Sequence, residues 1–117
     1  MSRHILIVDD NVALAENLAE LLEDEGHRTT TASCGERAID LSGALDFDLL
    51  LSDVRMPGIS GLELVARLRA CRPRLSCLLM TAYSSEALRR EALSAGVAAI
   101  LDKPLDLDVL FSHVSGS

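Results

Sequence analysis

Short apolar runs recur along the chain at the length expected of buried strands. They are Ile5–Val8, Phe47–Leu51, Cys77–Met80 and Ala98–Leu101. None alternates apolar with polar residues, which is typical of strands covered on both faces in a parallel sheet. A fifth candidate, His27–Thr31, is β-branched but polar, as expected of an exposed edge strand. The pattern predicts one sheet of five strands.

Helical patterns separate these runs. A leucine face that ends before Gly26 predicts the first helix. Its members are Leu14, Leu18, Leu21 and Leu22. The second and third helices each open on a serine with a glutamate three residues later, which is the spacing of a capping box. These pairs are Ser33 with Glu36 and Ser60 with Glu63.

The last two helices differ in how much apolar surface they carry. The fourth, roughly residues 85–95, has Leu88 and Leu93 as its expected anchors, so we expect it to be weakly held and easily moved. The fifth follows Pro104 and has a broader apolar face. That face consists of Leu107, Leu110, Phe111 and Val114. Five βα units in succession predict an α/β fold, a parallel sheet with helices on both sides.

Composition narrows the class of protein. The 117 residues, 49% of them hydrophobic, suffice for one core and are too few for two domains. A net charge of -7 argues against binding to a nucleic-acid backbone. No apolar run is long enough to span a bilayer, and no secretory signal is expected. Three cysteines without metal-ligand spacing fit reduced thiols, so we expect a cytoplasmic domain.

Polar side chains follow four of the five predicted strands. Asp9 and Asp10 follow the first, Asp53 the third, Thr81 the fourth and Lys103 the fifth. In open α/β sheets, ligands bind beyond these carboxyl ends. Carboxylates brought within about 5 Å repel by roughly 3 kcal/mol per pair at an effective dielectric constant of about 20. A hard cation such as Mg²⁺ removes that repulsion.

The joint placement of these groups indicates phosphoryl chemistry. Carboxylates, a metal ion, the Lys103 ammonium and the Thr81 hydroxyl together suit a phosphoryl group, which an aspartate can accept. Taken singly, each residue has an ordinary explanation. An acidic pair caps a helix, Asp53 occupies a turn, and a lysine is solvated at the surface. Only the combination favours a site.

Four segments resemble, in order and spacing, the receiver domain of two-component response regulators. They are "ILIVDDN", "LLLSDVRMPGISGLEL", "LLMTAY" and "AGVAAILDKPLD". The resemblance covers residues 4–114 and implies a flavodoxin-like (βα)5 fold, a doubly wound parallel sheet of order 2-1-3-4-5. It also implies one receiver domain over residues 1–117, which either stands alone or forms the N-terminal part of a longer regulator.

The resemblance implies a role for each residue at the strand ends. Asp53 is the phosphoacceptor, and Thr81 and Lys103 contact the phosphoryl group. The peptide bond between Lys103 and Pro104 is cis in the family. The implied Mg²⁺ ligands are Asp9 through water, Asp10, Asp53 and the backbone carbonyl of Arg55.

The resemblance also implies partners and a mode of action. A sensor histidine kinase or phosphotransfer protein donates the phosphoryl group in a Mg²⁺-dependent reaction. Phosphorylation then switches the face formed by the fourth helix, fifth strand and fifth helix. Two copies of the domain are also expected to dimerise through this face. The domain is a signalling phosphoacceptor that catalyses only its own phosphorylation and dephosphorylation. We expect no direct contact with nucleic acid or membranes.

Three alternatives compete with this interpretation. A phosphatase with an aspartyl-phosphate intermediate needs a general acid where this chain has Arg55, which cannot serve as one. A flavodoxin-like electron carrier needs a Ser/Thr/Gly-rich phosphate loop where the chain has Asp9 and Asp10. A degenerate receiver would bind partners without phosphorylation. The complete set of site residues argues against it, but Ile100, where many receivers carry an aromatic residue, leaves it open.

Overall fold

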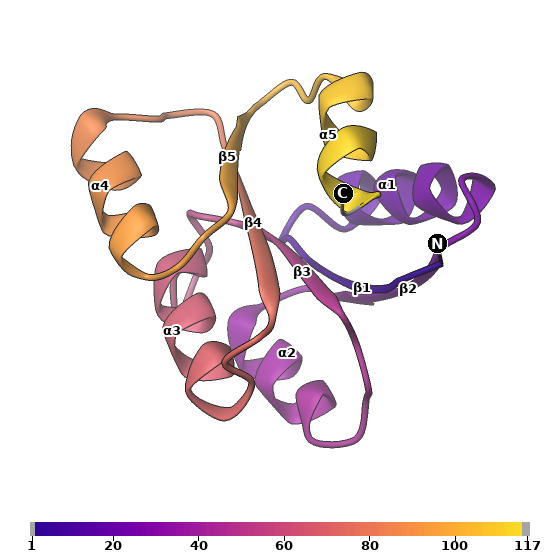
Figure 1. The fold of residues 1–117 in the computed structure, drawn as a ribbon, viewed down its shortest axis with the longest axis horizontal. Coiled ribbons are helices and arrows are strands. Elements are labelled where there is room, and N and C mark those ends of the chain that lie inside the picture. Colours follow the sequence, from indigo (N-terminus) through magenta and orange to yellow (C-terminus); the bar gives the residue numbers. More distant parts are fainter. Residues whose placement is uncertain (1, 116–117) are drawn as a thin grey trace.

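The structure, a computed structural model, describes residues 2–115. Within this range five strands alternate with five helices (Figure 1). The strands are β1 (His4–Val8), β2 (Arg28–Ala32), β3 (Leu49–Asp53), β4 (Ser76–Thr81) and β5 (Ala99–Asp102). The helices are α1 (Val12–Asp24), α2 (Gly35–Ser42), α3 (Gly61–Cys71), α4 (Glu86–Ser94) and α5 (Leu107–Val114).

All neighbouring strands pair in parallel, in the order β2-β1-β3-β4-β5. This confirms the predicted flavodoxin-like sheet. β1 and β3 are buried along their whole length, as their unbroken apolar sequences predicted. β2 is polar and partly exposed, and it forms an edge of the sheet, also as predicted.

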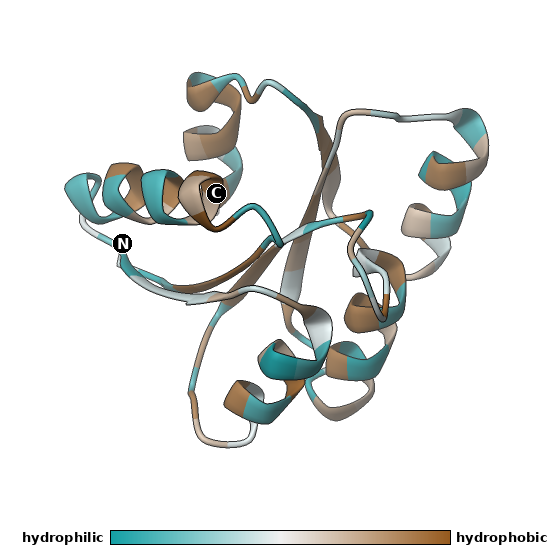
Figure 2. Cartoon of the chain, turned by 180° about the vertical axis from the view of Figure 1, so that it is seen from behind, coloured by the Kyte–Doolittle hydropathy of each residue, from teal (hydrophilic) through white to brown (hydrophobic). Residues whose placement is uncertain are grey.

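Helices cover both faces of the sheet, α1 and α5 on one side and α2, α3 and α4 on the other (Figure 1). Alternate residues of β1 supply the two layers. Ile5 and Ile7 pack with α1 and α5, whereas Leu6 and Val8 pack on the opposite side. Figure 2 shows the resulting pattern of apolar strands between helices with one apolar and one polar side. Within residues 2–115, no helix combines the length and apolar character needed to cross a membrane.

Three helix ends follow the local sequence. Gly26, with φ of 94°, lies just beyond the end of α1 in a conformation that favours glycine. The Ser60 side chain caps α3 by accepting the N–H of Glu63 at 3.2 Å. Ser85 caps α4 in the same way, accepting the N–H of Leu88 at 3.1 Å. Each of these ends depends on one nearby residue, a glycine backbone at the end of α1 and a serine side chain at the start of α3 and of α4.

The start of α2 differs from the prediction. Its N-cap residue is Cys34 rather than Ser33, and the Cys34 side chain makes no capping hydrogen bond. A capping box would turn Glu36 back toward the first residues of its own helix. Instead, the Glu36 carboxylate accepts the N–H of Ile59, at 3.4 Å, from the loop after β3. The predicted capping box is therefore wrong, because a distant segment offers the glutamate another donor.

Helix α4 makes few buried contacts with the sheet. Within Glu86–Ser94, Ala92 is the fully buried residue and Leu88 is half-buried. The expectation that Leu93 would be an anchor is wrong, since Leu93 is 76% exposed. Five residues at helical pitch place Leu93 about 140° around the axis from Leu88, whereas Ala92 falls on the same side as Leu88.

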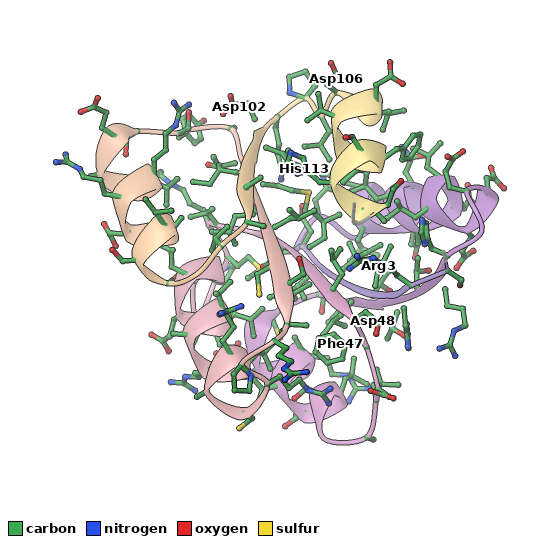
Figure 3. The ribbon with its side chains drawn as sticks, viewed as in Figure 1. Arg3, Phe47, Asp48, Asp102, Asp106 and His113 are labelled. Atoms are coloured by element: carbon green, nitrogen blue, oxygen red, sulfur yellow. The ribbon has the colours of Figure 1, made fainter. Side chains whose placement is uncertain are left out.

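At the amino ends of the strands, Arg72 joins two connecting segments. Its guanidinium donates to the carbonyls of Ser42 and Leu45, at 2.6 and 2.7 Å, and lies 4.5 Å from the centre of the Phe47 ring. Figure 3 shows Phe47 at the opposite end of the sheet from Asp102. This contact stabilises the end of the sheet away from the polar strand ends.

Candidate functional site

The carboxyl ends of neighbouring strands bring charged side chains together. Asp9 follows β1, Asp53 is the last residue of β3, and Lys103 follows β5. The strands are in register there, since Val8 pairs with Ser52. Because parallel strands end at the same edge, residues far apart in the sequence meet at one place.

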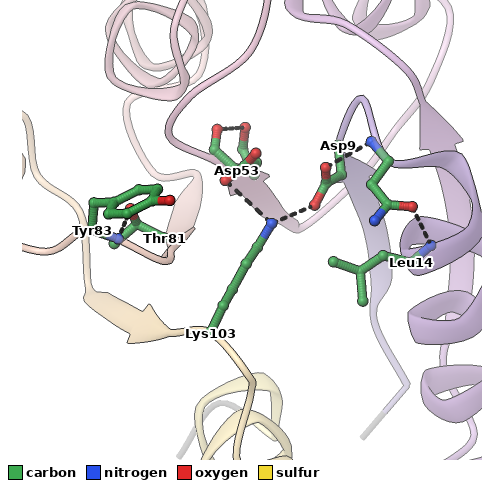
Figure 4. A network of polar contacts seen from close by, with 8 residues as sticks. Asp9, Leu14, Asp53, Thr81, Tyr83 and Lys103 are labelled. Carbon is green, nitrogen blue, oxygen red and sulfur yellow. Dashed lines mark hydrogen bonds and ion pairs between the residues drawn. The ribbon is translucent and has the colours of Figure 1, made fainter.

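The Lys103 ammonium lies between two carboxylates (Figure 4). Its Nζ is 3.0 Å from Oδ2 of Asp9 and 3.4 Å from Oδ1 of Asp53. Asp9 is only 1% exposed and Asp53 8%. Partial exclusion of water strengthens such charge-assisted contacts, so this bridge ties together the ends of β1, β3 and β5.

Asp9 is held by the backbone as well as by Lys103. Its Oδ1 accepts the N–H of Asn11 at 2.9 Å, and its own N–H donates to the carbonyl of Ala32 at 3.1 Å. Asn11 is also the N-cap residue of α1, because its side chain accepts the N–H of Leu14 at 3.1 Å. Asn11 thus performs the capping that an acidic pair could have provided, which leaves Asp9 and Asp10 available for the site. The position of Asn11 just before an apolar helix was the signal for this role.

The backbone of Asp53 is fixed by the residues that follow it. The N–H of Val54 donates to the backbone carbonyl of Met80 at 3.0 Å. The carbonyl of Val54 accepts the N–H of Gly61 at 2.9 Å. A Cβ at Gly61 would lie 2.3 Å from the carbonyl oxygen of Asp53. Only glycine therefore allows α3 to begin against the end of β3, and this close approach positions the Asp53 carboxylate.

Burial and charge shift the pKa of both members of the central pair. Burial raises the pKa of Asp53 above its ordinary value, with further increases from Asp9 and Asp10, while Lys103 opposes them. For Lys103, burial lowers the pKa, but its hydrogen bond and attraction to Asp9, together with Asp53, outweigh burial and raise it. Lys103 therefore remains an ammonium, and an ionised Asp53 is held at a cost in free energy.

The donor set fits a hard divalent cation. Carboxylate oxygens of Asp9, Asp10 and Asp53 all lie within 4.8 Å of one another. Oxygen-only ligands suit Mg²⁺, which also retains several waters. Asp10 is exposed, so the cluster is open to solvent on one side. A bound cation would also relieve the repulsion that raises the pKa of Asp53.

Tyr83, in the loop after β4, contacts both Thr81 and Arg55. Thr81 is buried, with 2% of the residue exposed. Its hydroxyl accepts a hydrogen bond from the backbone N–H of Tyr83 at 3.0 Å (Figure 4). The Arg55 guanidinium lies over the Tyr83 ring, 5.0 Å from its centre. This stacking joins the loop after β3 to the loop after β4. It was not predicted, because the direction of two exposed loop side chains depends on the folded arrangement.

The end of β5 carries the remaining features implied by the resemblance. The peptide bond between Lys103 and Pro104 is cis, as expected. The N–H of Lys103 donates to the carbonyl of Thr81 at 2.8 Å, which keeps the ends of β4 and β5 side by side. Ile100 is partly buried on β5 and pairs with Leu79.

Comparison with known proteins agrees with this architecture. The chain matches the response regulator receiver domain family over residues 5–115. A response regulator receiver protein from Anaeromyxobacter sp. is 42% identical over 103 residues, which cover 88% of this chain and 43% of that protein. The transcriptional regulatory protein FixJ from Azorhizobium caulinodans is 37% identical over 111 residues, covering 95% and 53%. This chain spans about half the length of these relatives.

A solved structure supports the same assignment. The response regulator protein TrrA from Thermotoga maritima, in complex with Mg²⁺-BeF, superposes with a TM-score of 0.87. It is 33% identical, and the match covers 97% of this chain and 96% of that one. On the family match, the sequence identity and the shared fold, the chain belongs to the response regulator receiver domain family.

Proposed function

We propose that this domain accepts a phosphoryl group on Asp53 from a sensor histidine kinase or a phosphotransfer protein, in a Mg²⁺-dependent reaction. The observation that carries the proposal is the buried Asp53 carboxylate beside Lys103 and within one cluster with Asp9 and Asp10. An Asp53 oxygen attacks phosphorus while the bond from phosphorus to the donor's imidazole nitrogen breaks. The product is an aspartyl phosphate, and the imidazole regains a proton.

Two side chains of this domain are suited to hold the phosphoryl oxygens. Lys103 already lies 3.4 Å from Asp53 and supplies positive charge. The Thr81 hydroxyl accepts a hydrogen bond from Tyr83, so its own proton remains available to donate to a phosphoryl oxygen. Preorganised donors of this kind stabilise charge on the transferring group.

The proposed metal ligands are Asp10, Asp53, the carbonyl of Arg55 and, through water, Asp9. Bound Mg²⁺ would supply further neutralisation of the phosphoryl oxygens. Of the two aspartates after β1, Asp10 is the one open to a cation from solvent. Asp10 is exposed at the rim, whereas Asp9 is held by Lys103 and Asn11.

An apolar groove beside the site is suited to the phosphoryl donor. It has a volume of about 550 Å³ and lies between α1 and the segment that joins β5 to α5. Its lining includes Leu14, Leu21, Leu105 and Leu107. Lys103 lines this groove and also contacts Asp53, so a donor helix seated in the groove would lie close to the phosphoacceptor.

The rest of the proposal concerns the output. The domain acts in the cytoplasm as a signalling phosphoacceptor, catalysing only its own phosphorylation and dephosphorylation. Residues 1–117 belong to one receiver domain, alone or as the N-terminal part of a longer regulator, and its α4-β5-α5 face changes on phosphorylation and supports dimerisation. With a net charge of -7, this domain is not expected to bind nucleic acid directly.

The first prediction tests the phosphoacceptor. Incubation with a small acyl phosphate and Mg²⁺ should add the mass of one phosphoryl group to the wild-type protein. Asp53→Asn should add none, because an amide cannot form the acyl phosphate. Asp40→Asn, which changes an exposed aspartate on α2, should behave like wild type. Undiminished phosphorylation of Asp53→Asn, measured by intact mass, would show that the site is elsewhere.

The second prediction concerns the metal. Mg²⁺ should raise the melting temperature of the wild-type domain, since a ligand at a hundred times its dissociation constant stabilises the native state by about 2.7 kcal/mol. Asp10→Ala should remove most of this response because it removes a direct ligand. The measurement is thermal unfolding over a range of Mg²⁺ concentrations. An equal response in Asp10→Ala would place the cation elsewhere.

The third prediction follows from the raised pKa of Asp53. A folded-state pKa above the unfolded value means that protons favour the native state. The ionised carboxylate therefore destabilises the metal-free domain above the folded pKa, and this cost declines as pH falls through the folded pKa and is gone below the unfolded pKa. Asp53→Asn should raise the metal-free melting temperature by a few degrees at neutral pH and by less in acid. A lower melting temperature for Asp53→Asn at neutral pH contradicts this account.

The fourth prediction separates donor docking from chemistry. Leu107→Asp places a charge in the groove and should slow transfer from a phosphorylated kinase about tenfold, equivalent to about 1.4 kcal/mol. Its phosphorylation by a small acyl phosphate should remain unchanged. Leu93→Asp is the matched control, since Leu93 is exposed on α4 and outside the groove. Equal kinase rates for Leu107→Asp and wild type would exclude the groove as the docking surface.

A further inference from the structure

The loop after β3 rests against the first turn of α2. Oε2 of Glu36 accepts the N–H of Ile59 at 3.4 Å. A Cβ built on Gly58 would lie 2.5 and 2.9 Å from the two carboxylate oxygens of Glu36. The carboxylate therefore lies directly over the Gly58 backbone. Gly58 has a φ of 83°, a conformation that favours glycine, so the loop turns sharply under this side chain.

A second contact, from the neighbouring residue of α2, holds the same loop. A Cβ on Gly35 would lie 2.3 Å from Cγ1 of Ile59, so the Ile59 side chain packs against the bare backbone of Gly35. Consecutive residues of α2 thus engage Ile59 in two ways. The Ile59 side chain packs against the backbone of Gly35, and the Ile59 N–H donates a hydrogen bond to the Glu36 carboxylate.

These contacts complete the support of a loop whose base is already fixed. At the base, the carbonyl of Val54 accepts the N–H of Gly61 at 2.9 Å. At the far side of the loop, Glu36 engages Gly58 and Ile59. Arg55 lies between these two attachments, and the proposed metal ligand is its backbone carbonyl. Movement of the Gly58 turn would therefore displace that carbonyl.

We propose that Glu36 is a positioning residue for the Mg²⁺ site, acting through the loop and not as a ligand. This inference rests on the proposed function, because the Arg55 carbonyl has a role as a ligand only if the cluster of Asp9, Asp10 and Asp53 binds a cation. Glu36 lies outside that cluster. Its carboxylate holds the turn from α2, so the carbonyl is already in place when the cation arrives. Residues that orient metal ligands commonly contribute to affinity in this way.

The simplest competing role for Glu36 is local. A carboxylate in the first turn of a helix interacts favourably with the helix dipole, whatever it touches. That role predicts a loss of overall stability without any effect on the loop or the cation. Glu86 occupies the corresponding part of α4 and provides the matched control.

The experiment compares Glu36→Ala, Glu36→Gln and Glu86→Ala in the full chain. Two quantities are measured, the Mg²⁺ concentration that gives half of the rise in melting temperature, and the exchange rate of the Ile59 amide in metal-free protein. Glu36→Ala should raise the half-saturating Mg²⁺ concentration by about tenfold, which is the smaller end of the affinity losses seen when residues that orient metal ligands are removed. It should also speed hydrogen exchange at the Ile59 amide. Glu36→Gln keeps an oxygen acceptor, so both quantities should stay near wild type. Glu86→Ala should change neither.

The outcomes separate this inference from the proposed function. A wild-type protein without any Mg²⁺ response would remove the proposed metal site, and the role of Glu36 with it. A normal wild-type response that Glu36→Ala leaves intact would overturn the role of Glu36 alone. Loss of the response in Glu36→Gln to the same extent as in Glu36→Ala would also overturn it, because the charge and not the hydrogen bond would then be responsible.

Discussion

The ammonium of Lys103, shared between the carboxylates of Asp9 and Asp53, is the interaction on which the site depends. Lys103 follows β5, and its long side chain reaches past β4 to residues at the ends of β3 and β1. Leaving a buried charge without its partner costs about 3–5 kcal/mol, so removal of Lys103 would disturb three strand ends at once. The sheet order is what makes this bridge geometrically possible.

The loop after β3 is the element that this arrangement requires to be rigid. Gly61 fixes its base, Glu36 holds its turn, and the stacking of Arg55 on Tyr83 joins it to the next loop. Each attachment comes from a different part of the chain. Under the proposed function, such support would reduce the reorganisation that accompanies phosphoryl transfer, because the proposed metal ligands and hydrogen-bond donors would be held in place before the reaction begins.

The sequence predicted the parts of this molecule that depend on local pattern. Unbroken apolar runs became the buried strands, and Ser60 became the cap of α3. The resemblance supplied the strand order, and the rule that parallel strands end at one edge placed Asp9, Asp53 and Lys103 together. The hydrogen bond from the Ile59 N–H to the Glu36 carboxylate, which takes the place of the predicted capping box, was not predictable because the two residues are 23 positions apart. The exposure of Leu93, in contrast, follows from helical pitch and could have been foreseen.

The shallow seating of α4 has a consequence for the strength of the signal. Between Glu86 and Ser94, Ala92 is the one residue that the fold buries fully. Under the proposed function, little free energy would therefore separate the observed position of this helix from a second position, and we expect the domain to sample both without a phosphoryl group. A preference of about 1.4 kcal/mol changes the ratio of the two positions tenfold. Output would thus be graded, with a basal level set by how much apolar surface the α4 sequence buries.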